Sequence, residues 1–240
     1  MQIYGKNSVF ERLKINPQSI NQVYLNETLE EPEIISLIQK NKIAHKFMKR
    51  NQFFNLERKR NTQGIIAETD NFIYADFDTL LSQTELEKPV FLMLDSITDP
   101  QNIGSIMRTA ACLGNFAIVL PKNRAIDITE TVLHIATGAE NYIPIAKVTN
   151  ITQAIESAKD AGYFITGAVV MDGTGIFETE LTFPLCLVIG SEGKGIRQGL
   201  LTHIDFLVTI PMTGAGLTLN TAQAASIFCY EITRQQQKVK

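Results

Sequence analysis

The sequence predicts an α/β protein that consists of a domain with a parallel sheet and a smaller α/β domain preceding it. Two observations indicate the parallel sheet. From Pro89 onward, short apolar runs alternate with segments of helical periodicity, which is the order of parallel strands joined by helices. These runs also lack the strict alternation of half-buried strands, so we expect helices to cover both faces of the sheet.

The larger domain is expected to contain six strands in chain order. They are VFLML (90–94), FAIVL (116–120), IPIAKV (143–148), YFITGAVV (163–170), LCLVIG (185–190) and FLVTIP (206–211). Sites in open parallel sheets form beyond the carboxyl ends of the strands. The polar or glycine-rich segments DSITDPQNIG, GSEGKG and PMTGAG follow three of these strands, so they are the expected site loops.

The smaller domain is expected to occupy residues 1–76, and the larger one residues 89–240. In the first part, helical patterns cover about 6–14 and 31–41, and QVYLN, GIIAE and FIYAD resemble strands. The acidic stretch 77–88 is interpreted as a linker, with a surface helix between the two domains as the alternative.

Composition excludes several classes of protein. The 240 residues are 45% hydrophobic and 20% charged, which is ordinary for globular proteins and excludes fibrous and disordered ones. No run approaches the roughly 20 apolar residues of a membrane span, and the N-terminus lacks the apolar core of a signal peptide. We therefore expect a cytoplasmic protein with no membrane partner.

The cysteines and histidines give no sign of a disulfide or a metal site. Cys112, Cys186 and Cys229 are far apart in the chain, and we expect them to be reduced core residues. The three histidines lack the spacing of metal ligands, so no metal is expected.

A basic segment in the smaller domain indicates a nucleic-acid contact. The net charge is −3, yet residues 40–60 contain eight Lys or Arg and one Glu. The residues expected to contact RNA are Lys49, Arg50, Arg58 and Arg60. A solvated helix face is the alternative for this segment. Phe47, Phe53 and Phe54 lie among these charges, where they either stack on bases or pack in the core.

Arg108 has an unusual position in the segment DPQNIGSIMRTAA. It falls within about two turns of an expected helix start, where unpaired backbone N–H groups already concentrate positive charge. A bound anion would make a cation favourable there, and an ordinary surface arginine is the alternative.

The last helix, expected within 218–235, is small or apolar on nearly all sides between Ala222 and Cys229. It should therefore be buried by its own domain, by a second subunit or by both. The glycine clusters match neither the dinucleotide fingerprint nor the Walker A loop.

Three segments together resemble a known family. DPQNIGSIMRTA (99–110), LVIGSEGKGI (187–196) and IPMTGAGLTLNTAQAA (210–225) are similar to the three ordered motifs of the SpoU family of RNA 2′-O-ribose methyltransferases, in the SPOUT superfamily. IYGKNSVFERL and TQGIIAE resemble the N-terminal RNA-recognition domain of its 23S ribosomal-RNA guanosine branch. The resemblance implies a C-terminal trefoil knot in the larger domain and a ribosomal-protein-like fold in the smaller one.

The resemblance also implies an activity and its residues. The expected reaction is S-adenosylmethionine-dependent methylation of a ribose 2′-hydroxyl in RNA, ribosomal rather than transfer RNA, by a homodimer joined through the knotted region. The implied catalytic residues are Asn102, Arg108, Glu192 and Asn220. The implied cofactor-binding residues are Thr137, Gly138, Gly190, Ile210, Pro211 and Leu219.

Two points stay open. The third motif commonly reads Ser-Leu-Asn-Val-Ser, whereas this chain has Thr218, Thr221 and Ala222 around Leu219 and Asn220, and Thr62 replaces a common histidine. A catalytically weak RNA-binding or ribosome-assembly factor is therefore the second hypothesis. Because arginine stays protonated in proteins, we expect Arg108 to clamp phosphate and support the developing alkoxide, with a general-base role as the alternative.

Overall fold

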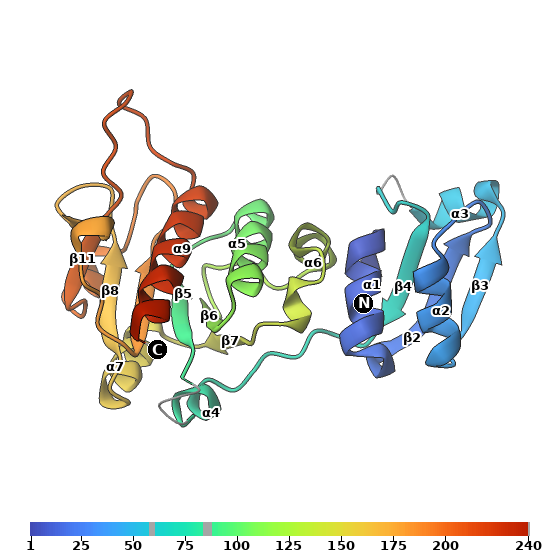
Figure 1. Cartoon of the computed structure of the whole chain (residues 1–240), viewed down its shortest axis with the longest axis horizontal. Helices are drawn as coiled ribbons and strands as arrows, with labels where there is room; N and C mark the ends of the chain where they lie inside the picture. The colour runs from blue at the N-terminus through green and yellow to red at the C-terminus, as the bar shows by residue number, and fades with distance from the viewer. Residues whose placement is uncertain (58–60, 84–87, 240) are drawn as a thin grey trace. The chain divides into compact units, whose positions relative to one another are not determined.

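The computed structural model describes residues 1–57, 61–83 and 88–239, and the chain forms two compact units (Figure 1). Unit 1 comprises Met1–Ile73 together with Ile128–Tyr142, and unit 2 comprises Tyr74–Asp127 together with Ile143–Lys240. This division differs from the one expected at residue 76, because the segment 128–142 packs with the N-terminal residues.

Unit 1 contains a four-stranded sheet in the order β1-β4-β2-β3. Its strands are β1 (Gln2–Tyr4), β2 (Ile20–Asn26), β3 (His45–Met48) and β4 (Ile65–Thr69). Its N-terminal helices are α1 (Lys6–Ile15), η1 (Pro17–Ser19), α2 (Pro32–Lys40) and α3 (Arg50–Glu57). The expected helices and the strands in QVYLN and GIIAE are confirmed, but the strand expected in FIYAD is wrong. Only Ala75 of that run pairs, through an isolated bridge to Ala146.

The segment 128–142 completes unit 1 with α6 (Glu130–Ala136) and η2 (Ala139–Asn141). The Tyr4 and His134 rings stack with their centroids 4.3 Å apart. Arg12 Nη2 lies 3.2 Å from Glu140 Oε1, and these two side chains are 10% and 0% exposed. Burial disfavours the charged carboxylate and raises the pKa of Glu140, although the Arg12 charge partly opposes this effect.

Unit 2 contains a seven-stranded sheet in the order β7-β6-β5-β10-β8-β11-β9, in which every pairing is parallel. The strands are β5 (Val90–Leu94), β6 (Phe116–Pro121), β7 (Ile145–Val148), β8 (Phe164–Ala168), β9 (Thr174–Gly175), β10 (Leu185–Ile189) and β11 (Phe206–Thr209). The six expected strands and their parallel arrangement are confirmed. The two-residue β9 is an addition that the sequence did not indicate.

The helices of unit 2 include one inside the expected linker. They are α4 (Phe77–Leu81), α5 (Pro100–Leu113), α7 (Ile151–Asp160), η3 (Ile176–Glu178), α8 (Gln198–Leu201) and α9 (Thr221–Val239). Phe77 and Leu80 of α4 are buried in the same core cluster as Phe91 of β5. The residues 77–81 therefore belong to the folded unit rather than to a spacer.

The last helix, α9, is covered only in part by its own chain, because Gln223 is exposed and Ile227 and Tyr230 are 40% and 64% exposed. One burial expectation needs correction. Cys112 is exposed on α5, whereas Cys186 and Cys229 are buried as expected. Burial raises the pKa of the Cys229 thiol to about 12, which keeps this sulfur protonated at neutral pH. Within the described residues, no helix combines the length and the apolar character that a membrane span requires.

Candidate active site

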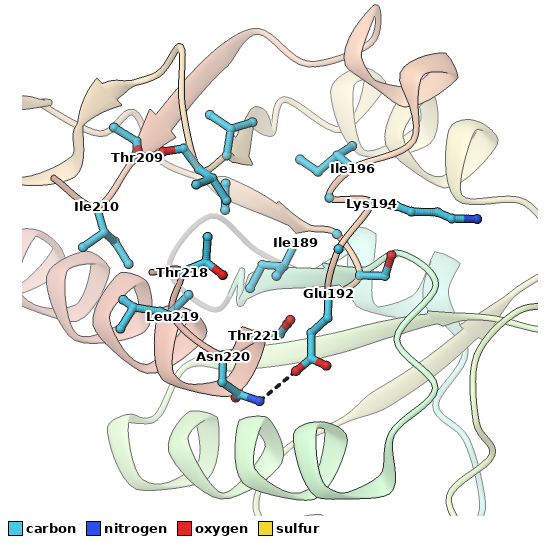
Figure 2. Close-up of a pocket in the computed structure, with 18 of the residues that line it drawn as sticks. Ile189, Glu192, Lys194, Ile196, Thr209, Ile210, Thr218, Leu219, Asn220 and Thr221 are labelled. Atoms are coloured by element: carbon cyan, nitrogen blue, oxygen red, sulfur yellow. Dashed lines mark hydrogen bonds between the residues drawn. The ribbon is translucent and has the colours of Figure 1, made fainter. Parts of the chain in front are cut away.

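A cavity of about 760 Å³ lies beyond the carboxyl ends of β8, β10 and β11 (Figure 2). Its walls come from residues 168–170, from the loop 190–196, from residues 209, 210 and 212 after β11, and from residues 218–221. Ile189, Ile210 and Leu219 supply apolar surface, while Thr209 and Thr218 add hydroxyl groups. The glycine-rich loops after β10 and β11 thus form a cavity, as their position after parallel strands predicted.

The loop 190–196 folds back tightly on itself. Ser191 N–H donates to Gly195 O at 3.2 Å, and Gly195 N–H donates to Ser191 O at 2.9 Å. A Cβ added at Gly190 would lie 2.0 Å from the carbonyl carbon of Gly195, which no side chain tolerates. Position 190 therefore requires glycine, because two backbone segments meet there.

Asp95 fastens both ends of this loop. Its N–H donates to Ile189 O at 2.8 Å, at the point where the chain enters the loop. Its carboxylate, which is fully buried, accepts hydrogen bonds from Arg197 Nε at 2.8 and 2.9 Å, at the point where the chain leaves. Charge-assisted hydrogen bonds of this kind are strong, so Asp95, which directly follows β5, fixes the position of the loop.

Three polar side chains from distant parts of the sequence meet at one edge of the cavity. Glu192 Oε1 accepts hydrogen bonds from Asn102 Nδ2 at 2.8 Å and from Asn220 Nδ2 at 2.7 Å. Asn220 Nδ2 also donates to Asn102 Oδ1 at 2.9 Å. Figure 2 shows Glu192 and Asn220 pointing toward one another. This Asn102–Glu192–Asn220 cluster connects α5, the loop after β10 and the start of α9.

Helix starts position two members of the cluster. Asp99 caps α5 by accepting from Gln101 N–H, and Pro100 begins the helix, which places Asn102 in the first turn with 4% of its surface exposed. Asn220 Oδ1 accepts from Ala222 N–H at 2.8 Å and so caps α9. Asn220 therefore caps α9 with its amide oxygen while its amide nitrogen bonds Glu192.

The structure brings some of the expected site residues together and not others. The expected residues that line the cavity are Gly190, Glu192, Ile210, Leu219 and Asn220. Pro211 does not line it, and its ring lies beside Gly175 instead. Thr137 and Gly138 belong to unit 1, where the Glu11 side chain lies against Gly138. The structure thus gives these last three residues no place in the cavity wall.

Arg108 lies on α5 with an exposed side chain. Its side chain forms no hydrogen bond or ion pair with any other described residue, in contrast to the side chain of Asn102 on the same helix. The structure therefore leaves its guanidinium open to an external anion and does not join it to the Asn102–Glu192–Asn220 cluster.

The sequence did not indicate several residues of this region. Asp95 and Arg197 were missed, although a charged residue directly after the apolar run VFLML is a signal for a buried, paired carboxylate. Lys194 and Phe228 also line the cavity. Lys194 lies inside the expected motif 187–196 but was not singled out there, whereas Phe228 reaches the cavity only because α9 packs beside it.

The basic segment of unit 1 is partly described. Lys49 and Arg50 are exposed, while Arg58 and Arg60 lie outside the described residues. In the described ranges, no group of three or more potential ligands could hold a metal ion.

The fold and the site define an α/β enzyme whose ligand cavity lies at the carboxyl edge of a parallel sheet. Residues 89–230 match the model of the SpoU rRNA methylase family, and residues 2–75 match the RNA 2′-O ribose methyltransferase substrate-binding model. The chain belongs to the SpoU methylase family and is an RNA 2′-O-ribose methyltransferase.

Three similar proteins match this chain over nearly its whole length. A TrmH family tRNA/rRNA methyltransferase of Bacillus subtilis is 35% identical, covering 99% of this chain and 96% of the relative. A 23S rRNA (guanosine-2′-O-)-methyltransferase, RlmB, of Pseudomonas putida is 32% identical over 98% and 96%. The SpoU methyltransferase AviRb of Streptomyces viridochromogenes, solved with AdoMet, has a similar fold, with a TM-score of 0.81, 22% identity and coverage of 99% and 91%.

Proposed function

We propose that this enzyme methylates the 2′-hydroxyl of one guanosine in 23S ribosomal RNA, with S-adenosylmethionine as methyl donor. The main support for this reaction is the Asn102–Glu192–Asn220 cluster, which lies at the edge of a cavity built from the loops after β10 and β11. The RlmB relative and the substrate-binding match of unit 1 support ribosomal RNA as the substrate.

The cavity fits S-adenosylmethionine in size and in character. Its volume of about 760 Å³ is within the range of cofactor sites, and such sites are mostly apolar with a few placed polar groups. Gly190, Ile210 and Leu219 would hold the cofactor through apolar contact and through backbone that no side chain shields. When bound, the cofactor supplies an electrophilic methyl group on a sulfonium.

Gly190→Ala is expected to reduce the affinity for S-adenosylmethionine by roughly 5- to 150-fold, because the added methyl forces the loop 190–196 apart. Gly199→Ala is the matched control, since nothing lies within 4 Å of a Cβ at that position. Calorimetry with the full chain in the presence of a chelator measures both variants, because no metal is expected in the site. Equal affinities for the two variants would contradict the assignment of the cavity.

The side chains of the protein have two further roles, which are to align the ribose and to hold the phosphate beside it. The Asn102–Glu192–Asn220 cluster fixes the loop after β10 against the starts of α5 and α9, which aligns the ribose with the cavity. Arg108 holds the phosphate beside the target ribose and stabilises negative charge that develops on the 2′-oxygen.

The proposal includes the assembly of the chain. The last helix, α9, and the loops 190–196 and 209–221 form the trefoil knot of the family, and two copies associate through this region in the cytoplasm. The exposed stripe on α9, with Ile227 and Tyr230, supports a second copy as the cover for an otherwise largely buried helix.

Mapping of ribose methylation in total RNA tests the substrate. In a strain that lacks this protein, we expect one 2′-O-methylguanosine of 23S ribosomal RNA to disappear and to return when the gene is restored. A site lost from transfer RNA would transfer the assignment to that substrate. An unchanged map would favour the hypothesis of a catalytically weak RNA-binding or assembly factor.

A further inference from the structure

The three phenylalanines of the basic segment have different environments in unit 1. Phe53 is 1% exposed and packs with Tyr4 and Ile66. Phe54, the next residue of α3, is 66% exposed. Phe47 is 49% exposed on β3, where strand alternation turns it away from Met48, which packs against the Phe53 cluster. Phe47 therefore lies on the face of the sheet opposite to the one that α3 covers.

Phe54 lines a hollow of about 740 Å³. The other residues of this hollow are Glu27, Lys49, Arg50, Asn51 and Asn55. Asn51, Phe54 and Asn55 share one face of α3, because residues three and four apart on a helix are neighbours. All three side chains are exposed. One aromatic ring thus lies between two amides and next to two cations.

The cations of the hollow are available for a ligand. Lys49 and Arg50 are exposed, and neither forms an ion pair or a side-chain hydrogen bond with another described residue. An apolar partner would leave both charges and the side-chain N–H groups of Asn51 and Asn55 unsatisfied, which disfavours a protein core or a lipid surface as the occupant. A flat, polar-edged ligand with a negative charge satisfies the ring, the amides and the cations, and the two cations outnumber the one carboxylate of the hollow, Glu27.

An unpaired nucleotide has this combination of properties. Proteins that bind single-stranded nucleic acid place a base on an aromatic side chain and the flanking phosphates against Lys or Arg. A duplex does not expose the faces of its bases and would use only the cations.

We propose that Phe54 is a stacking platform for an unpaired base of the RNA substrate, with Lys49 and Arg50 on the flanking phosphates and Asn51 and Asn55 at the base edge. This inference rests on the proposed function for its ligand, RNA, and it adds that unit 1 selects an unpaired nucleotide. The segment 40–60 is then more than a solvated helix face.

The absence of tryptophan from the chain allows a direct test of stacking. In the full-length Phe54→Trp variant, the single indole should be quenched by a single-stranded oligoribonucleotide and much less by the same sequence in a duplex. The Phe47→Trp variant is the matched control, because it lies in the same basic segment but on the other face of the sheet. Equal quenching of the two variants, or equal quenching by duplex RNA, would overturn the proposal.

Affinity measurements give a second, independent result. Phe54→Ala should weaken binding of the single strand by about 5- to 150-fold, and it should leave the fold intact because this side chain is 66% exposed. Neutralising Lys49 and Arg50 together should reduce the salt slope by up to about 1.4. If Phe54→Ala binds like the parent, no stacking occurs at this residue.

The binding assays do not require methyl transfer, so the two proposals fail separately. If RNA quenches the indole but no methylation site is lost from the strain, stacking on Phe54 is supported and the proposed substrate is rejected. If a methylation site of 23S ribosomal RNA is lost but RNA does not quench the indole, the proposed substrate is supported and stacking on Phe54 is rejected.

Discussion

The Arg108→Ala enzyme is expected to transfer methyl groups about two to three orders of magnitude more slowly than the parent, with nearly unchanged affinity for S-adenosylmethionine. Arg108 is exposed on α5 and does not line the cavity, so its loss should spare cofactor binding. Its guanidinium has no partner among the described residues, and removing it takes away a positioned charge that RNA phosphate would use. Single-turnover assays with cofactor titrations measure both quantities, and parental rates would show that Arg108 has no essential role.

Arg108→Lys separates two roles of this residue. Lysine retains the charge but not the planar fork, so phosphate clamping predicts partial activity and a pH profile of unchanged shape. A general-base role predicts that activity rises steeply at alkaline pH, as the ammonium loses its proton more easily than a guanidinium. A single-turnover pH series on the parent and both variants distinguishes these outcomes.

Arg12→Met is expected to lower the free energy of unfolding by about 3–5 kcal/mol at pH 7, because it leaves the buried Glu140 carboxylate without its partner. The loss should be smaller at pH 5. Burial already raises the pKa of Glu140, and removing the Arg12 charge raises it further. A carboxyl group whose pKa is higher in the folded state favours folding at low pH, and this contribution disappears as the pH rises through the folded pKa.

Urea unfolding at both pH values provides the measurement, with two comparison variants. Lys14→Met lies on the same helix and removes an exposed ion pair with Glu11, which should cost less than about 1 kcal/mol. Replacing Arg12 and Glu140 together with Met should recover most of the loss, since no buried charge remains. Equal effects of Arg12→Met and Lys14→Met would show that burial of the pair does not matter.

Six of the seven strands of unit 2 could be predicted from the sequence, because they form continuous apolar runs, and β5, β6 and β10 are buried throughout. The strand β3 could not, since three of its four residues are exposed and its pattern is polar. A strand was wrongly predicted for FIYAD because the composition of this segment is typical of strands, whereas only Ala75 of the segment pairs with another residue. The helix α4 was interpreted as linker because its acidic surroundings hid Phe77 and Leu80, which face the core.

The cavity loops could be expected from their position after parallel strands, whereas the residues of the Asn102–Glu192–Asn220 cluster were named only through the family resemblance. Asn102, Glu192 and Asn220 are far apart in the chain, and only the arrangement of the strands brings their side chains within hydrogen-bond distance. The pairing of Asp95 with Arg197 spans 102 residues, and no local pattern encodes it. No local pattern encodes the pairing of Arg12 with Glu140 either. This pair joins the segment 128–142 to unit 1, whereas the sequence predicted that the smaller domain ends at residue 76.

The discontinuity of unit 1 has a consequence for the order of events during protein synthesis. A nascent chain that ends at Ile73 lacks α6 and η2, so Arg12 and the Tyr4 ring have not yet met Glu140 and His134. By the time Tyr142 emerges from the ribosome, β5, α5 and β6 of unit 2 have already been made. Unit 1 therefore completes its packing only after the first part of unit 2 exists, although domains are usually completed from the N-terminus as they emerge.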